Sequence, residues 1–129
     1  MIFIDTNYFL RFILKDNQQH SVQAANTFRQ AALGELSLVT STVVFFEIAW
    51  TLRHIYKNDH LALGEILFKL LQLNFEINDR GILIKAVIRF KDSDLELIDC
   101  YNLELAKDLK VKEFKTFDQK LARAFDKLA

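Results

Sequence analysis

The stretch MIFIDTNYFLRFIL (residues 1–14) decides the fold class of this chain. Residues 2–4 form a short run of β-branched and aromatic side chains, which predicts a fully buried strand. Asp5 follows at the end of this run, and residues 6–14 are predicted to form a short helix. A buried strand that leads directly into a helix is typical of an α/β domain with a parallel sheet.

The rest of the chain continues this alternation of short strands and helices. Further strands are predicted at 36–40, 75–77 and 113–117, and further helices at 21–33, 42–56, 60–73, 79–90, 95–109 and 119–128. Residues 15–20 are expected to form a polar loop and Gly34 to end the helix that Ser21 begins, while Ser41 or Thr42 caps the next helix. We therefore predict a helix-rich α/β fold, a small parallel β-sheet flanked by α-helices.

Composition supports this fold class. The chain has 129 residues, of which 51% are hydrophobic and 26% charged, which suits one compact domain spanning 1–129. It contains no proline and only three glycines, whereas an all-β sandwich needs frequent turn residues.

Charge and cysteine content exclude several classes of protein. Seventeen basic and seventeen acidic residues balance, which argues against a basic arm around a duplex and against an acidic disordered tail. A nucleic-acid enzyme is still compatible with this balance, because it needs only local basic residues around its site. The single cysteine, Cys100, cannot form an internal disulfide, and we find neither a signal-like segment nor an apolar run of membrane-spanning length. A cytoplasmic location is expected.

Glu47 is the first acidic residue whose surroundings are unusual. It is the only ionisable residue between Glu35 and Arg53, in the middle of the apolar stretch VVFFEIAW. A helix that is apolar on all sides is usually buried, and a buried carboxylate is costly unless it is paired or bound to a metal. Glu47 is therefore either a metal or substrate ligand, or a residue on one narrow solvated face or paired with a cation such as Arg53.

Asp5 and Asp118 each follow a predicted strand and precede a predicted helix. In parallel α/β sheets, ligands bind at the carboxyl ends of the strands. Asp5 also fits the ordinary role of a helix N-cap. Thr116 and Gln119 have the spacing of a capping box, which would make Asp118 an acid of the first helical turn.

Asp99 shares a helix face with Glu96, three positions before it. Glu96 has a structural explanation, because Ser93 and Glu96 have capping-box spacing. Asp99 is predicted to lie beyond the first turn beside apolar Ile98 and Cys100, where it is either a site carboxylate or a solvated one.

Considered together, these four acids suggest a metal site. If the sheet is parallel, its strand ends meet at one edge, where clustered carboxylates repel one another unless a divalent cation neutralises them. Oxygen ligands suit Mg²⁺ or Mn²⁺ better than Zn²⁺, and such an ion can activate water and stabilise charge on a phosphodiester. The residues alone indicate only a possible acidic metal site.

Four segments, in this order and spacing, resemble the PIN-domain family, and within it the small VapC-type toxins of VapBC toxin–antitoxin pairs. They are IFIDTNYFLRFIL, STVVFFEIAWTLR, DLELIDCYNLELAK and FKTFDQKLAR, and the resemblance covers nearly the whole chain. It implies a small parallel sheet flanked by helices and a Mg²⁺- or Mn²⁺-dependent endoribonuclease, which hydrolyses RNA through a metal-activated water. The chain departs from the commonest pattern after Asp99, where Cys100, Tyr101 and Asn102 replace small residues.

The resemblance also implies roles for individual residues. The catalytic, metal-binding acids would be Asp5, Glu47, Asp99 and Asp118. Thr6 and Asn7 would orient Asp5, and Thr116 would support the site beside Asp118. Candidates for binding the RNA backbone are Arg11, Lys15, Arg53 and Lys115.

The same resemblance implies two protein partners. One is a second copy of the chain, in a homodimer, and the other is an antitoxin whose C-terminal segment covers the site. The apolar helices predicted at 42–56 and 60–73 are candidate surfaces for both.

Two other functions remain open. The chain could be a PIN nuclease of RNA processing without an antitoxin, or a non-catalytic PIN-like module that binds protein or RNA. A nucleophilic role for Cys100 is disfavoured, because no pattern places His20, His54 or His60 beside it, and these histidines do not have zinc-site spacing.

Overall fold

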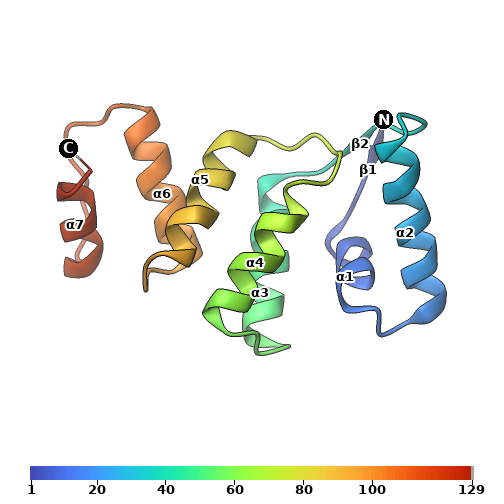
Figure 1. Ribbon diagram of the computed structural model, residues 1–129. Coiled ribbons are helices and arrows are strands. Elements are labelled where there is room, and N and C mark those ends of the chain that lie inside the picture. Colours follow the sequence, from blue (N-terminus) through green and yellow to red (C-terminus); the bar gives the residue numbers. More distant parts are fainter. Residues whose placement is uncertain (129) are drawn as a thin grey trace. The chain divides into compact units, whose positions relative to one another are not determined.

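The computed structural model describes residues 1–128. In this part of the chain, two short strands and seven helices form two compact units, Met1–Arg80 and the segment from Gly81 onward (Figure 1). Helices dominate both units, and the strands are parallel. The predicted helix-rich α/β fold with a small parallel sheet is confirmed.

The sheet of the first unit consists of β1 (Ile2–Phe3) and β2 (Leu38–Val39). Ile2 pairs with Leu38 and Phe3 with Val39, in parallel register. The strand predicted at 75–77 is reduced to a single parallel bridge between Glu76 and Val39. The prediction that residues 2–4 are all buried is wrong, because β1 is an edge strand that leaves Ile2 and Phe3 exposed and buries only Ile4.

Four helices complete the first unit. They are α1 (Thr6–Leu14), α2 (Gln18–Ala32), α3 (Thr42–His54) and α4 (His60–Leu70). Helix α1 packs against both α2 and α3, and α3 packs against α4. The centroid of the Phe9 ring lies 5.3 Å from that of Phe28 and 5.4 Å from that of Phe75, so aromatic contacts form the centre of this core.

Local side-chain chemistry explains where these helices begin and end. Helix α2 begins three residues before the predicted Ser21, because the Asn17 side chain accepts a hydrogen bond of 3.0 Å from the His20 amide. Gly34 follows α2 with a left-handed φ of 81°, as predicted for its end. Ser41 caps α3 by accepting a 3.2 Å hydrogen bond from the Val44 amide, also as predicted.

Arg80 stabilises the end of α4. Its guanidinium donates hydrogen bonds to the carbonyls of Leu71 and Phe75 and lies over the Phe75 ring, 4.6 Å from the centroid. The Leu71 carbonyl would otherwise lack a partner, since the last carbonyls of a helix have none within it. Burial lowers the pKa of Arg80, but a guanidinium remains charged at neutral pH.

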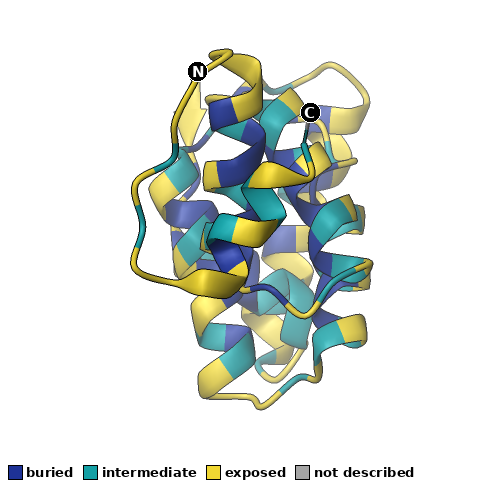
Figure 2. Cartoon of the chain, turned by 90° about the vertical axis from the view of Figure 1, so that its left-hand side faces the viewer, coloured by how far each residue is buried: buried dark blue, intermediate teal, exposed yellow. Residues whose placement is uncertain are grey.

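Helix α5 spans Arg80–Lys91, and all of it except Arg80 belongs to the second unit. This unit also contains α6 (Leu97–Asp108) and α7 (Gln119–Asp126). Along these helices buried and exposed residues alternate (Figure 2). The strand predicted at 113–117 is absent from the described residues. This segment is mostly exposed, and its Phe114 ring packs 5.2 Å from Phe125 of α7 instead of entering a sheet.

Helix α6 ends in a Schellman motif that is built on lysine rather than glycine. The Lys110 amide donates to the Lys107 carbonyl (3.1 Å) and the Val111 amide to the Ala106 carbonyl (3.2 Å). Lys110 has a left-handed φ of 56°, a conformation that costs a lysine more than a glycine. In residues 1–128, no helix combines the length and apolar character needed to cross a membrane.

Candidate acidic sites in the two units

Asp5 lies at the junction of β1 and α1, as predicted. The Ile4 amide donates to Val39 (2.9 Å), and the buried Thr40 hydroxyl donates to the Ile4 carbonyl (2.8 Å), so two bonds fix the backbone just before Asp5. Asp5 occupies the N-cap position of α1, but its side chain makes no capping hydrogen bond. The exposed carboxylate is therefore held at the strand end without serving as a cap.

Glu47 is brought to the same region by a hydrogen bond from Thr6, whose buried hydroxyl donates to Glu47 Oε1. Of the alternatives left open for the surroundings of Glu47, the structure shows a solvated face of the helix. Helix α3 has a solvated stripe on which Glu47 is exposed together with Val43 and Trp50, because these positions are three or four residues apart. The first unit thus places Glu47 next to Thr6, the residue that follows Asp5.

The predicted supporting residues of Asp5 lie on the first turn of α1. The Thr6 hydroxyl donates to Glu47, and the orientation of Asp5 by Thr6 and Asn7 stays a prediction. Asn7 is exposed and lines a hollow of about 320 Å³ with Tyr8, Arg11 and His20.

Asp99 is half-buried in the second unit and lies in the first turn of α6, not beyond it as predicted. The difference arises because Glu96 is itself the N-cap residue and makes no side-chain capping bond, so the predicted capping box with Ser93 does not form. Burial raises the pKa of Asp99, and the negative charges of Asp118 and Glu96 raise it further, while Lys120 lowers it.

Asp118 is the N-cap residue of α7. Its Oδ1 accepts a hydrogen bond from the Leu121 amide (3.1 Å), and the Thr116 hydroxyl accepts one from the Asp118 amide (3.1 Å). The capping box predicted between Thr116 and Gln119 is therefore replaced by an Asp118 cap, with Thr116 holding the turn before it. Within this unit, Asp118 lies near enough to Asp99 for its negative charge to raise the pKa of Asp99.

The donor chemistry of these acids fits a hard divalent cation. All four carry carboxylate oxygens, the ligands that Mg²⁺ and Mn²⁺ prefer, and a nearby cation would relieve the repulsion felt by Asp99. Within the described part of either unit, no three Asp, Glu, His or Cys side chains already form a metal-binding group. The structure brings Glu47 to Thr6 in the first unit and Asp118 to Asp99 in the second.

The cations predicted to bind RNA differ in their surroundings. Arg11 pairs with Asp16 (3.0 Å) and Lys115 with Glu113 (3.1 Å). Lys15 is exposed at the C-cap of α1 with a left-handed φ of 56°, and Arg53 is half-buried in the last turn of α3. Two of the four cations are thus already neutralised by acids close to them in the sequence.

The helices predicted to meet protein partners do expose apolar side chains. Val43 and Trp50 on α3 are 74% and 57% exposed, Ile55 after α3 is 59% exposed, and Leu61 on α4 is 61% exposed. The Trp50 ring also lies 5.0 Å from the His54 ring.

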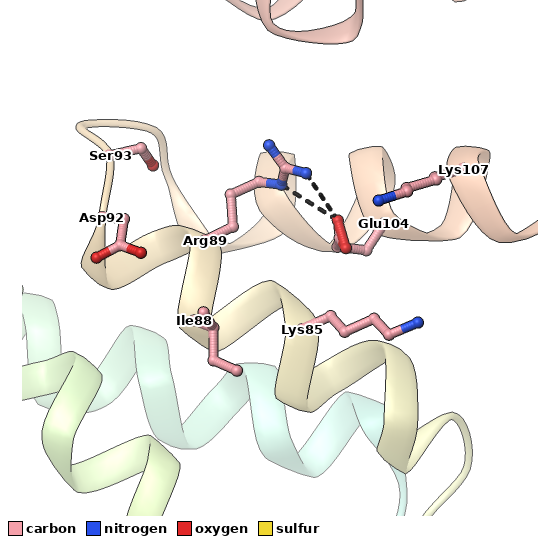
Figure 3. A pocket seen from close by; sticks show the side chains of 7 residues that line it. All are labelled: Lys85, Ile88, Arg89, Asp92, Ser93, Glu104 and Lys107. Carbon is pink, nitrogen blue, oxygen red and sulfur yellow. Dashed lines mark hydrogen bonds and ion pairs between the residues drawn. The ribbon is translucent and has the colours of Figure 1, made fainter. Parts of the chain in front are cut away.

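Sequence patterns did not identify the ion pair that links α5 and α6. Arg89 Nε and Nη2 donate to the same oxygen of Glu104, over 3.2 and 2.9 Å, and Glu104 is only 6% exposed (Figure 3). The pair lies in a hollow of about 500 Å³ between the two helices. The only sequence signal is the position of Glu104 among the apolar residues Leu103, Leu105 and Ala106.

Comparison with known proteins identifies one family. The model of the family described as PIN domain matches residues 2–127. No curated protein matches the chain, and no solved structure does.

Proposed function

Because this chain belongs to the PIN-domain family, whose members are generally nucleases that use divalent metal ions, we propose that it is a Mg²⁺- or Mn²⁺-dependent endoribonuclease. We further propose that it is the toxin of a toxin–antitoxin pair. The observation that carries the nuclease proposal is the match of the PIN domain model over residues 2–127, to which the structure adds a half-buried carboxylate, Asp99 of α6, with Asp118 and Glu96 near it. Such a group favours a cation beside it.

The metal ligands in this proposal are Asp5, Glu47, Asp99 and Asp118. When bound, the metal lowers the pKa of water and stabilises the negative charge that develops on a phosphodiester. That all four carboxylates serve one site is the prediction of the sequence resemblance. Within the first unit, Asp5 presents an exposed carboxylate at a strand end, and within the second unit the charge of Asp118 raises the pKa of the half-buried Asp99.

The chain's own residues orient these carboxylates. Thr6 donates to one oxygen of Glu47 and fixes its rotamer, while Thr40 fixes the backbone before Asp5. Asp118 uses one oxygen to cap α7, which holds its side chain in one orientation. A carboxylate also serves as the base for the attacking water, and hydrolysis leaves a 5′-phosphate and a 3′-hydroxyl on the RNA.

Two partners belong to the proposal. The exposed apolar residues of α3 and α4 supply a surface for a second copy of the chain or for an amphipathic helix of the antitoxin. An antitoxin that covers the acidic site would also supply a basic side chain to balance its charge.

The nuclease proposal is tested by incubating purified protein with single-stranded and structured RNA in Mg²⁺ or Mn²⁺. EDTA and the variants Asp5→Asn and Asp99→Asn should each abolish cleavage. Asp108→Asn is the matched control, since Asp108 is an exposed acid at the far end of α6, and it should cleave like the original protein.

Cleavage that survives Asp5→Asn would show contaminating nuclease and overturn the site. Absence of both cleavage and Mn²⁺ binding would favour the non-catalytic binding module. The toxin role is tested separately by co-expression with the product of a small gene immediately upstream. Failure of any such product to bind and inhibit the protein would favour a nuclease of RNA processing.

A further inference from the structure

The hollow between α5 and α6 gathers positive charge. Lys85 extends from α5 and Lys107 from α6, and the Arg89–Glu104 pair bridges the two helices beside them (Figure 3). Arg89 pairs with Glu104 inside the hollow, and Asp92 is the one other acid that lines it, so the two lysines leave a net positive charge there.

A second hollow lies at the end of α6 and shares Lys107 with the first. It has a volume of about 330 Å³ and is lined by Lys107, Lys110 and Lys112 together with Asp126. Lys107 belongs to both hollows, so the lysines form a connected row. We call the row of Lys85, Lys107, Lys110 and Lys112 the basic strip.

The lysines of the basic strip differ from others in this unit. Lys115 pairs with Glu113 over 3.1 Å and Lys120 with Asp94 over 2.7 Å. Among the described residues of the unit, no acid lies within ion-pair distance of a basic-strip lysine, and all four are exposed. Their charge is therefore available to a ligand.

The charges of the second unit are partly separated along α6. Glu96 and Asp99 lie at its start, near Asp118, while Lys107 and Lys110 lie at its end together with one acid, Asp108. Asp99 and Lys107 are eight positions apart, which is about 12 Å along a helix. A ligand that contacts both ends must extend over about this distance and carry negative charge where it meets the lysines.

Helix dipoles explain only part of this separation. They favour an acid in the first turn of α6 and Lys107 in its last turn. Lys85 lies in the interior of α5, where neither end of the dipole reaches it. Lys85 and Lys107 line one hollow from two helices, so a ligand with several negative charges can contact both.

We propose that the basic strip binds backbone phosphates of the RNA whose cleavage is assigned above to the acidic residues. This inference rests on the proposed nuclease function and assigns RNA contacts to lysines that sequence reasoning did not select. Binding of this kind is independent of base sequence and falls as salt rises, because each neutralised phosphate releases counterions.

The experiment measures binding of a fluorescent single-stranded RNA in EDTA, where no metal-dependent cleavage occurs. The test variant is Lys85→Gln/Lys107→Gln, which spares Arg89 and so keeps the ion pair to Glu104. The matched control is Lys69→Gln/Lys127→Gln, two exposed lysines outside both hollows. Circular dichroism melting of all three proteins checks that they fold equally well.

The test variant should bind RNA on the order of tenfold more weakly at 0.1 M salt. The slope of log affinity against log salt should become shallower by about 1.4, which is 0.7 for each lost phosphate contact. Lys110→Gln/Lys112→Gln should act in the same direction. The control should match the original protein in affinity and slope.

Unchanged RNA affinity and slope in the test variant would overturn the inference, whether or not the protein cleaves RNA. Loss of RNA binding in a protein that never cleaves RNA would uphold the strip and remove the nuclease function. A third measurement uses poly-glutamate as an acidic polypeptide. If the variant loses poly-glutamate binding but keeps RNA binding, the strip is a protein-binding surface and the RNA assignment is wrong.

Discussion

The hydroxyl of Thr6, at the start of α1, donates a hydrogen bond to the carboxylate of Glu47, in the middle of α3 and 41 positions away in the sequence. Thr6 is buried and directly follows Asp5, so one residue connects the two predicted acids of the first unit. A hydrogen bond to a charged acceptor is stronger than one between neutral groups. The orientation of Glu47 therefore depends on the hydroxyl of Thr6.

Thr6→Val should weaken Mn²⁺ binding and lower the RNA cleavage rate about tenfold or more, because a misoriented catalytic group is costly. It should also reduce the free energy of unfolding by about 1 kcal/mol. Thr6→Ser keeps the hydroxyl and should restore metal binding. Equal metal binding in the valine and serine variants would show that the hydrogen bond has no role in positioning Glu47.

Asp99→Asn should stabilise the fold at neutral pH while abolishing cleavage. Burial and the charges of Asp118 and Glu96 raise the pKa of Asp99, so the folded protein holds its proton more tightly than the unfolded chain. Ionised Asp99 therefore lowers stability once pH rises above the ordinary pKa of 3.8 and through the raised value. Asparagine cannot ionise and avoids this cost.

The measurement for Asp99 is urea unfolding of the original protein and of Asp99→Asn at neutral pH and below pH 3.8. The variant should be more stable at neutral pH, and the difference should shrink at the acidic pH, where both states are protonated. A constant difference at both pH values would mean that the substitution acts through packing.

Cys100 should be unreactive in the folded protein. Its side chain is fully buried, and burial raises the pKa of the thiol to about 11, so almost no thiolate exists near pH 8. A disulfide reagent should label it only after denaturation, and Cys100→Ala should keep cleaving RNA. Rapid labelling of the native protein would contradict the buried position.

The ion pair of Arg89 and Glu104 should stabilise the second unit only as a pair. Arg89→Met leaves the carboxylate of Glu104 buried without its partner and should cost about 3 kcal/mol. Adding Glu104→Leu should recover much of this loss, because the buried charge is then gone. A double-mutant cycle by urea unfolding measures the coupling, and additive losses would mean that the pair contributes nothing.

The sequence predicts the fold best where local chemistry acts alone. The helix at 6–14 is found with the predicted bounds, and Ser41 and Gly34 mark helix ends as expected. The predicted strand at 113–117 fails because alternation cannot show whether a partner strand exists. Phe114 packs against Phe125 of α7, a contact that depends on the tertiary structure.

The sequence predicted which acidic residues are site candidates better than it predicted the burial and hydrogen bonding around them. Capping-box spacing placed the helix starts one turn too early for α6 and missed that Asp118 itself caps α7. A solvated face of α3 that carries Glu47 was one of the alternatives from the sequence, and the apolar composition could not decide between them, since exposure depends on which neighbours cover the helix. Thr40 and Glu104 were missed because buried polar residues leave no periodic signal.

Lys110 has two roles, because its backbone ends helix α6 and its side chain carries a positive charge at the second hollow. Its left-handed φ of 56° ends α6, and its side chain lines the second hollow of the basic strip. A glycine there would relieve backbone strain of about 1 kcal/mol while removing the cation. Selection for stability alone would thus favour glycine. Lys15 follows α1 with the same φ of 56°, so lysine recurs at helix ends of this chain, and at Lys110 it also places a cation in the second hollow.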